Sequence, residues 1–406
     1  MIKKLKPYYG DLIDTINISG SKSESNRLLI LQHLFKGLDL ENLSNSDDTK
    51  YLNKALQQSK GLVDISHAGT AMRFLTAYFA CKDGAEVILT GSDRMQNRPI
   101  KVLVDALQSI GADISYVEKK GYPPLRINGK QITAERVEID GNVSSQYISA
   151  LLLVAPSLRN GLQVDLRGEV TSRPYILMTL SLLEQLGVTH LWEGNSIKVN
   201  PLTFKKTDTI TVESDWSSAS YYYSLAALGN KVDIHLTSFK ENSLQGDSKL
   251  VDIYKEFGVV SIFNDHTLTL KKVAQNHASV QFNLIETPDL AQTIAVTCLG
   301  LNMDCQLAGL HTLKIKETDR LVALKNELEK LGGKVNITSE QLELKASETI
   351  NADVAIDTYQ DHRMAMAFAP LALKVPLQIN EANVVSKSYP NFWSDLRMLS
   401  INFSEI

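Results

Sequence analysis

One hydrophobic pattern recurs along the 406-residue chain. Apolar residues at helical spacing run up to a Leu-Gly, Ile-Gly or Phe-Gly pair, and a β-branched run follows at once. The pair falls at Gly111, Gly187, Gly258 and Gly332, with a weaker copy at Gly61. Glycine there suits the left-handed residue that ends a helix. The spacing of roughly 70 to 75 residues predicts an internal repeat of one α/β unit. Ordinary helix-glycine-strand punctuation, without a repeat, is the alternative.

Alternating apolar and polar positions between these helices predict strands. They are "AEVILTG", "VEIDG", "LQVDLRG", "KVDIHLTS" and "LTLKKV". The chain is too long for one small core, and the units fall before and after a break near "ITVESDWSSAS". No Pro/Gly/Ser-rich linker lies there, so we expect two similar α/β domains joined by a short, hinge-like connection.

The segment "GSKSES" connects the strand-like "DTINIS" to the helical pattern "NRLLILQHLF". Serines at such a place cap backbone N–H groups, and the helix dipole favours an anion beside them. With Lys22 and Arg27 added, the segment predicts a phosphate or carboxylate site. It is no P-loop, because the Gly-Lys pair and its spacing are missing. A capped surface helix with two solvated bases is the alternative.

Four further helix starts in the first half of the chain are polar, cationic or rich in small residues. Gly69 and Thr70 open a helix where a ligand can approach the backbone closely. The other three starts carry Arg98 before Pro99, the run Ser144, Ser145 and Gln146, and Ser172 before a Pro-led helix. Five such starts in one chain favour a shared anionic ligand.

The second half of the chain supplies acids and more bases. Asp289 opens an apolar helix, and Lys387 precedes the last one. Lys316, Glu317, Asp319 and Arg320 crowd another helix start, and Asp361, His362 and Arg363 precede a buried-looking helix. Dipole-stabilising acids, a solvated charge run and a structural histidine are the plain alternatives. Metal ligands at suitable spacing are not found.

The net charge of −4 argues against a nucleic-acid or membrane-surface partner. Anions must therefore be met by local clusters, and seven cations from both halves are candidates: Lys22, Arg27, Arg98, Lys316, Arg320, Arg363 and Lys387. Such a set implies small phosphate- or carboxylate-bearing substrates, and bases from both halves imply closure around them. Three cysteines, with neither a leader nor a membrane-spanning run, indicate a cytoplasmic protein.

An ordered set of motifs now carries a resemblance. The set is "SGSKSESNR", "HAGTAMRF", "NRPI", "GNVSSQY", "SRPY", "TPDLAQTIA", "KETDR", "DHRMAMAFA" and "SKSYPNFW". It resembles the enolpyruvyl transferases, specifically the 5-enolpyruvylshikimate-3-phosphate synthase family, from about residue 18 to 393. The resemblance implies two similar domains, each of three βαβαββ units with helices inside, joined by a double-stranded hinge. The implied lobes are 19–213, and 1–18 with 214–406.

The resemblance also implies a reaction and the residues that serve it. Phosphoenolpyruvate gives its enolpyruvyl group to the 5-hydroxyl of shikimate 3-phosphate in a closing interdomain cleft, with release of phosphate, in chorismate and aromatic amino-acid biosynthesis. Asp289 is implied as the base and Glu317 as the acid, with Lys22 and Lys316 beside them. Implied shikimate 3-phosphate residues are Lys22, Ser23, Arg27, Ser144, Ser145, Gln146, Ser172, Tyr175, Asp289, Thr312 and Lys316. Implied phosphoenolpyruvate residues are Lys22, Gly69, Arg98, Gln146, Arg320, Arg363 and Lys387.

The resemblance implies a monomer without metal or organic cofactor, and glyphosate as a candidate inhibitor. Three departures concern the site: His67 and Phe74 around the Gly69 helix, Thr312 where the family commonly has Asn, and Arg173 where it commonly has Lys. The alternatives are a sibling transferase acting on UDP-N-acetylglucosamine, a non-catalytic anion-binding protein, and a more distant RNA cyclase. The sibling typically has a loop cysteine and an early Lys-Asn pair, whereas Cys81 ends a helix and the early pair is Lys22-Ser23.

Overall fold

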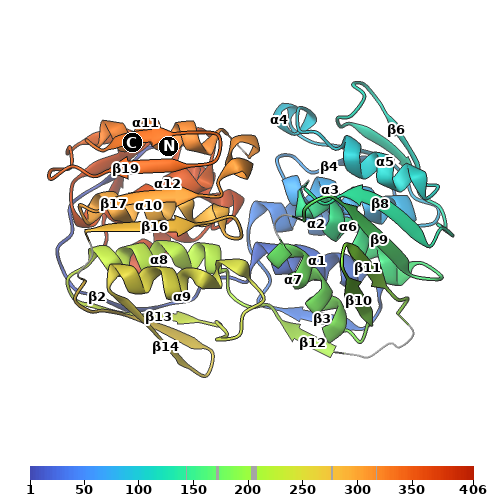
Figure 1. Cartoon of the computed structure of the whole chain (residues 1–406), viewed down its shortest axis with the longest axis horizontal. Coiled ribbons are helices and arrows are strands. Elements are labelled where there is room, and N and C mark those ends of the chain that lie inside the picture. Colours follow the sequence, from blue (N-terminus) through green and yellow to red (C-terminus); the bar gives the residue numbers. More distant parts are fainter. Residues whose placement is uncertain (143, 171–172, 203–207, 276–277, 317) are drawn as a thin grey trace. The chain divides into compact units, whose positions relative to one another are not determined.

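The computed structural model describes residues 1–142, 144–170, 173–202, 208–275, 278–316 and 318–406. The chain divides into two compact units (Figure 1). Unit 1 contains residues 1–19 and 213–406, and unit 2 contains residues 20–212. The chain therefore passes from one unit to the other twice, after Ser19 and after Val212.

Five four-stranded sheets share one set of strand directions, and four of them share one strand order in the chain, first-second-fourth-third; in the fifth, the N-terminal strand β1 takes the place of the fourth strand. The first two strands run parallel, and the other two neighbours pair antiparallel. In unit 1 the sheets are β2-β13-β15-β14, β16-β17-β19-β18 and β20-β21-β1-β22, and in unit 2 they are β4-β5-β7-β6 and β8-β9-β11-β10. A parallel pair needs a crossover, and a helix follows the first strand of each sheet. The repeat predicted from the Leu-Gly pattern is therefore confirmed.

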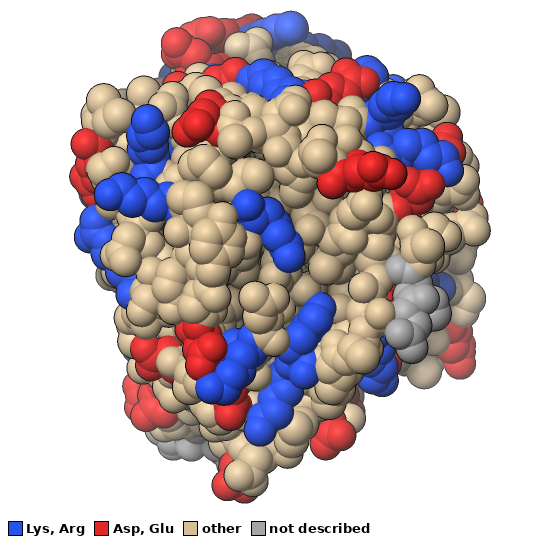
Figure 2. Space-filling view, turned by 90° about the vertical axis from the view of Figure 1, so that its left-hand side faces the viewer, with Lys and Arg blue, Asp and Glu red and all other residues tan. Residues whose placement is uncertain are grey.

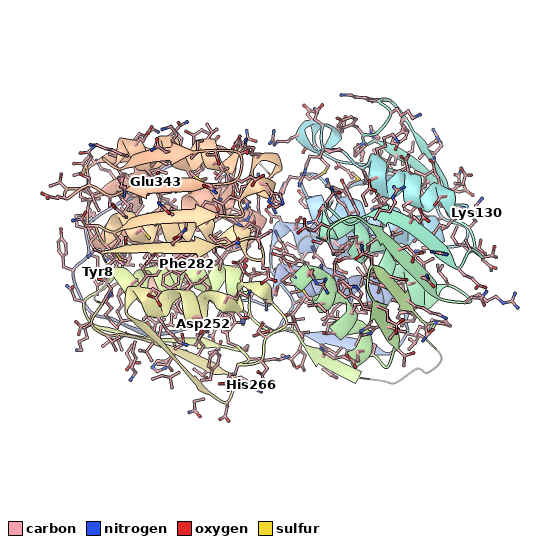
Figure 3. All side chains as sticks on the ribbon, viewed as in Figure 1. Tyr8, Lys130, Asp252, His266, Phe282 and Glu343 are labelled. Atoms are coloured by element: carbon pink, nitrogen blue, oxygen red, sulfur yellow. The ribbon has the colours of Figure 1, made fainter. Side chains whose placement is uncertain are left out.

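The strands of unit 1 are three to six residues long. Their bounds are β1 Lys3–Leu5, β2 Leu12–Ile16, β13 Val232–Thr237, β14 Val259–Asn264, β15 Thr267–Lys272, β16 Ser279–Asn283, β17 Asp304–Ala308, β18 Lys334–Ile337, β19 Leu342–Lys345, β20 Val354–Ile356, β21 Leu377–Ile379 and β22 Phe403–Glu405. In Figure 3, Phe282 lies on β16 and Glu343 on β19, two strands of one sheet, and His266 lies in the turn after β14.

The strands of unit 2 are β3 Leu38–Glu41, β4 Lys60–Asp64, β5 Glu86–Thr90, β6 Asp113–Tyr116, β7 Leu125–Asn128, β8 Arg136–Asp140, β9 Leu162–Arg167, β10 His190–Glu193, β11 Ser196–Val199 and β12 Asp208–Thr211. The third α/β repeat of unit 2 is smaller than the others. Among the described residues its strands are β3 and β12, which pair in parallel. Helix α2 (Asp47–Leu56) follows β3 and leads to β4 of the next sheet.

The helices form the cores of the two units. In unit 1, α8 (Trp216–Leu228), α10 (Ala291–Gly300) and α12 (His362–Phe368) pack on one another and are buried almost throughout. In unit 2, α1 (Lys22–Leu34), α3 (Gly69–Cys81), α6 (Ser145–Val154) and α7 (Arg173–Gln185) also pack on one another; α3 and α6 are buried almost throughout, whereas α1 is buried from Glu24 to Leu31 and α7 is buried on one side. A helix that is apolar on all sides must be covered on all sides. The fold class is therefore the predicted α/β fold with inside helices.

The remaining helices include the short ones that the sequence pattern placed less well. They are α4 (Asp93–Gln96), α5 (Lys101–Ser109), α9 (Leu250–Ile253), α11 (Arg320–Lys330) and α13 (Phe392–Met398). The helix expected before Gly258 is only α9 followed by a 3-10 turn, and Pro99 precedes α5 by two residues instead of lying in its first turn. All five pattern glycines have a positive φ, between 71° and 104°.

Charged side chains are scattered over the face of the molecule shown in Figure 2. On the face shown in Figure 2, basic and acidic side chains are interspersed, and among the described residues there no broad field of one sign forms. No described helix has the length and the apolar character that crossing a membrane requires.

Candidate active site

Unit 2 gathers most of its predicted residues at the N-terminal ends of α1, α3 and α6. Ser21 caps α1 by accepting the Glu24 N–H at 3.5 Å, and Ser144 caps α6 by accepting the Gln146 N–H at 3.4 Å. Both serines stand in extended or turn backbone one residue before the helix, as capping requires. Lys22 and Ser23 fall in the first turn of α1, half-buried.

Gly69 and Arg98 are brought into direct contact. Gly69 is the first residue of α3, and a Cβ atom built on it would lie 2.4 Å from Nη1 of Arg98. A side chain at this position would therefore displace the Arg98 guanidinium that packs on the glycine. Nearby, the Gln146 amide nitrogen donates to Thr70 Oγ1 at 3.3 Å, which ties the start of α6 to the start of α3.

Two buried groups hold the Arg98 turn in place. The Pro99 carbonyl accepts hydrogen bonds from the Tyr147 hydroxyl at 2.6 Å and from Arg73 Nη2 at 3.4 Å. Burial lowers the pKa of Arg73 to about 10, and the charge of Arg98 adds to that effect. Two guanidinium groups so close together favour an anion between or beside them.

Arg27 is placed deeper than the sequence suggested. It is 2% exposed and donates to Thr179 Oγ1 at 2.7 Å, Ser23 O at 2.8 Å, and Ser149 Oγ and Tyr175 O, both at 3.2 Å. Burial lowers its pKa to about 10, so it stays charged at neutral pH. The guanidinium therefore joins α1, α6 and α7, and Tyr175 meets it through its backbone.

Two of the departing residues, Phe74 and Arg173, lie in unit 2 and make local contacts. The Phe74 ring lies under the Arg27 guanidinium, 5.4 Å from Cζ to the ring centroid, so this side chain fills space against a predicted site residue. The Arg173 guanidinium is stacked on Trp192 at 4.4 Å. Ser172 lies outside the described residues.

Unit 1 builds an ion-pair cluster around Asp289. Its Oδ1 lies 2.8 Å from Arg320 Nη1 and 3.5 Å from Lys316 Nζ, and its Oδ2 lies 3.0 Å from Arg363 Nη2. Asp289 precedes α10, whereas Arg320 and Arg363 stand at the starts of α11 and α12. Three helix starts therefore meet at one carboxylate.

Asp361 is the site residue to which the sequence reasoning gave no role. Its side chain is 0% exposed, caps α12 by accepting the Arg363 N–H at 2.9 Å, and pairs with Arg320 Nε at 2.6 Å. It therefore fixes both arginines. Its signal in the sequence was its place directly before His362 and Arg363, which is typical of an N-cap and does not reveal the long-range pair with Arg320.

Asp247 and Ser217 extend the cluster and were also missed. Arg363 Nη2 donates to Ser217 Oγ at 3.2 Å, and Ser217 Oγ donates to Asp247. Burial raises the pKa of Asp247 to about 6. Nothing in the local sequence around Asp247 differs from an ordinary turn, so only the fold brings it to Arg363.

The remaining predicted residues of unit 1 lie around this cluster or outside the description. Lys387 ends a 3-10 turn, Ala382–Lys387, and donates to the Gln360 carbonyl at 2.8 Å, one residue before Asp361. Thr312 lies in the 3-10 turn His311–Ile315, and its buried hydroxyl has no hydrogen-bond partner among the described residues. Glu317 lies outside the described residues.

The charge balance of the unit 1 cluster favours an anionic ligand. The cluster contains four cations, Lys316, Arg320, Arg363 and Lys387, and three carboxylates, Asp289, Asp361 and the Asp247 that is joined through Ser217; Lys387 contacts it through the Gln360 carbonyl. Arg guanidinium groups match phosphate and carboxylate oxygens in pairs. The fold and these groups together define a two-unit α/β protein built to hold small molecules with several negative charges.

The comparisons with known proteins agree with this class. The family model of EPSP synthase (3-phosphoshikimate 1-carboxyvinyltransferase) matches residues 58–396. A 3-phosphoshikimate 1-carboxyvinyltransferase of Bacteroides fragilis is 47% identical over 388 residues, 94% of each chain, and one of Haemophilus influenzae is 36% identical over 425 aligned positions, 95% of this chain and 96% of the relative. The chain belongs to the EPSP synthase family.

Solved structures confirm the fold. An EPSP synthase from Acinetobacter baumannii superposes with a TM-score of 0.82 at 19% identity, over 99% of both chains. The enolpyruvyl transferase NikO from Streptomyces tendae superposes with a TM-score of 0.74 at 12% identity, over 99% of this chain and 98% of that one.

Proposed function

We propose that the chain transfers the enolpyruvyl group of phosphoenolpyruvate to the 5-hydroxyl of shikimate 3-phosphate and releases phosphate. This is the reaction named for the family and for the relatives that match 94 to 96% of their length. It places the enzyme in the shikimate pathway, which supplies chorismate and the aromatic amino acids. The observation that carries the proposal is the Asp289 carboxylate held between Arg320 and Arg363.

The reaction needs a base, an acid and a cage for negative charge. Asp289 takes the proton of the 5-hydroxyl, whose oxygen bonds to C2 of phosphoenolpyruvate while a proton from Glu317 reaches the methylene carbon. The tetrahedral intermediate carries phosphate and carboxylate, and guanidinium and ammonium groups stabilise both. Elimination reverses the two roles: the methyl carbon loses a proton, the C–O bond to phosphate breaks, and the enol ether remains.

The proposal assigns the substrates to groups already described. Phosphoenolpyruvate binds Lys22, Gly69, Arg98, Gln146, Arg320, Arg363 and Lys387. Shikimate 3-phosphate binds Lys22, Ser23, Arg27, Ser144, Ser145, Gln146, Ser172, Tyr175, Asp289, Thr312 and Lys316. The Gly69–Arg98 contact and the Asp289 cluster support this assignment, because each offers a guanidinium group at a helix start.

The ion pairs of Asp289 link substrate binding to proton transfer. Its ion pairs with Arg320 and Arg363 neutralise part of the cationic cluster. A phosphate or carboxylate that binds these arginines competes for the same donors and leaves Asp289 with fewer of them. A carboxylate that accepts fewer hydrogen bonds is a stronger base, so binding of phosphoenolpyruvate prepares Asp289 to take the hydroxyl proton.

Phosphate release separates the proposed reaction from its alternatives. Purified protein is mixed with phosphoenolpyruvate and either shikimate 3-phosphate or UDP-N-acetylglucosamine, and inorganic phosphate is measured. We expect release with shikimate 3-phosphate alone. Release with the sugar nucleotide would assign the sibling activity, and release with neither would leave an anion-binding protein.

Glu317→Gln tests the acid. The amide keeps the shape of the side chain and removes its proton donation, so kcat should fall by about 10²-fold or more while both substrates still bind. The measurement is steady-state kinetics with equilibrium binding of each substrate. Unchanged turnover would remove Glu317 as the acid.

The proposal also includes a location, an oligomeric state and an inhibitor. A cytoplasmic location is supported by three free cysteines, Cys81, Cys298 and Cys305. A monomeric enzyme and inhibition by glyphosate, which carries the carboxylate and phosphonate charges that the arginines suit, are expectations that ultracentrifugation and the same phosphate assay test directly.

A further inference from the structure

The segment that carries Lys387 is closed on itself, and Tyr389, Phe392 and Trp393 are buried in it. It begins with the 3-10 turn Ala382–Lys387 and continues into α13. The Trp393 indole N–H donates to the Ala382 carbonyl at 2.8 Å, so the end of the segment returns to its start. The Tyr389 N–H donates to Val385 O at 2.7 Å, which ends the turn just after Lys387.

Tyr389 connects this segment to α8 and also closes it internally. Its hydroxyl donates to Asp395 Oδ2 at 2.6 Å, and it lies 2.7 Å from the hydroxyl of Tyr222. Because Tyr389 has one proton and gives it to Asp395, Tyr222 is the donor to Tyr389. The chain of hydrogen bonds therefore runs Tyr222, Tyr389, Asp395, from α8 through the Lys387 segment into α13.

The chain is shielded from water along its length. Tyr222 is 0% exposed and Tyr389 is 1% exposed. Burial raises the pKa of both phenols and of the Asp395 carboxyl. A buried hydrogen bond in a fixed network resists displacement, because breaking it leaves a polar group without a partner. The segment therefore has few alternative positions.

Lys387 is tied at its other end to the Asp289 cluster. Its ammonium donates to Gln360 O, and Gln360 and Tyr359 are consecutive non-glycine residues with φ of 57° and 52°. Such backbone is strained and persists only where the surroundings fix it. Asp361 follows at once and pairs with Arg320. The position of Lys387 is thereby linked to that of Arg320.

We propose that the hydrogen-bond chain Tyr222–Tyr389–Asp395 is a positioning device that holds the Lys387 ammonium where phosphoenolpyruvate binds. The proposal rests on the function proposed above, since it takes Lys387 as a donor-binding residue. Tyr222 and Tyr389 act through Lys387, and neither touches substrate. Loss of the chain should weaken binding of phosphoenolpyruvate in the ground state and in the transition state alike.

Tyr222→Phe is the test, and Tyr223→Phe is its matched control. Tyr223 is the next residue of α8, is 0% exposed, and makes an equally short bond, 2.6 Å, to Ser261 Oγ on β14, away from the Lys387 segment. Each variant loses one buried phenol hydrogen bond, so both should lose similar thermal stability. A purely structural role would affect the kinetics of both variants equally.

We expect Tyr222→Phe and Tyr389→Phe to raise KM for phosphoenolpyruvate about fivefold to tenfold, with kcat and KM for shikimate 3-phosphate within about twofold of wild type. Asp395→Asn keeps an oxygen that accepts from Tyr389 and should preserve KM. Tyr223→Phe should keep all constants. Equal KM values for Tyr222→Phe, Tyr389→Phe and Tyr223→Phe would overturn the proposal.

A second measurement separates this inference from the proposed function. The rate at which an amine-reactive ester acylates Lys387 in the ligand-free protein is followed by peptide mapping. We expect Tyr222→Phe to raise this rate about fivefold relative to Tyr223→Phe, because the ammonium leaves its carbonyl partner more often. Equal rates would sink the positioning role even if the enzyme is active. A wild-type protein that releases no phosphate refutes the proposed function, and the acylation rates then still decide the positioning.

Discussion

At the residue scale, single atoms decide which side chains the site tolerates. Gly69 has no room for a Cβ because Arg98 Nη1 occupies that place, 2.4 Å away. Asp361 has no exposed surface because Arg320 and the start of α12 surround it. Such contacts join residues far apart in sequence, so their importance becomes visible only in the folded chain.

Gly69→Ala should move the Arg98 guanidinium and weaken phosphoenolpyruvate binding. The new methyl group and Nη1 cannot occupy the same space, and the flexible end of the arginine gives way first. We expect KM for phosphoenolpyruvate to rise about tenfold, the loss of one charge-assisted hydrogen bond, with a parallel loss of glyphosate affinity. KM for shikimate 3-phosphate serves as the internal control. If phosphoenolpyruvate and glyphosate bind as before, Gly69 does not line the donor site.

Asp247 should make stability depend on pH in a direction opposite to that of most carboxylates. Burial raises its pKa to about 6, from an ordinary value of 3.8, so the unfolded chain releases this proton first as pH rises. The stability that protonated Asp247 contributes to the folded state is fully present below pH 4 and is lost as pH rises through 6. Relative to wild type, Asp247→Asn should therefore gain up to about 3 kcal/mol in the free energy of unfolding between pH 4 and 7. Denaturant unfolding at several pH values measures this, and parallel curves for the two proteins would contradict it.

At the element scale, helix starts organise the site, and sequence reasoning found them well. Ser21, Ser144 and Asp361 all cap the helices whose starts the motifs marked, and the glycines after the helices have left-handed backbone. These features are local, so residue type and spacing suffice to predict them. Two other features depend on packing between elements that are distant in the sequence, so the sequence pattern does not predict them. They are the burial of Arg27 and the hydrogen bonds from Arg363 through Ser217 to Asp247.

The cap of α11 offers a test at this scale. Asp319 accepts hydrogen bonds from the Leu321 and Val322 N–H groups at 3.1 and 3.2 Å, one residue before Arg320. Asp319→Ala should cost about 1 kcal/mol of stability and loosen the first turn of α11. Asp319→Asn retains a capping oxygen and should lose less. Thermal unfolding and KM for phosphoenolpyruvate are compared in both variants, and an alanine variant as stable as the asparagine variant would contradict this role.

At the scale of the whole molecule, an acidic protein binds acidic substrates through local positive clusters. The net charge is −4, whereas four cations, Lys316, Arg320, Arg363 and Lys387, lie in one cluster with Asp289, Asp361 and Asp247. Salt screens such clusters, so KM for phosphoenolpyruvate should rise several-fold between 0.05 and 0.5 M KCl while kcat changes little. Sodium sulfate at equal ionic strength distinguishes screening from competition by a dianion. A KM independent of KCl would argue against the charged clusters as the binding groups.

The strand order of one sheet in unit 1 also affects how the chain folds as it is made. β1 lies between β21 and β22, so its two hydrogen-bonding partners come some 370 to 400 residues later. Residues 20–212 form one continuous stretch of the chain, so unit 2 can fold during translation. The first strand therefore stays without its two partners until nearly the whole chain has been synthesised, so unit 1 can complete this sheet only after translation ends.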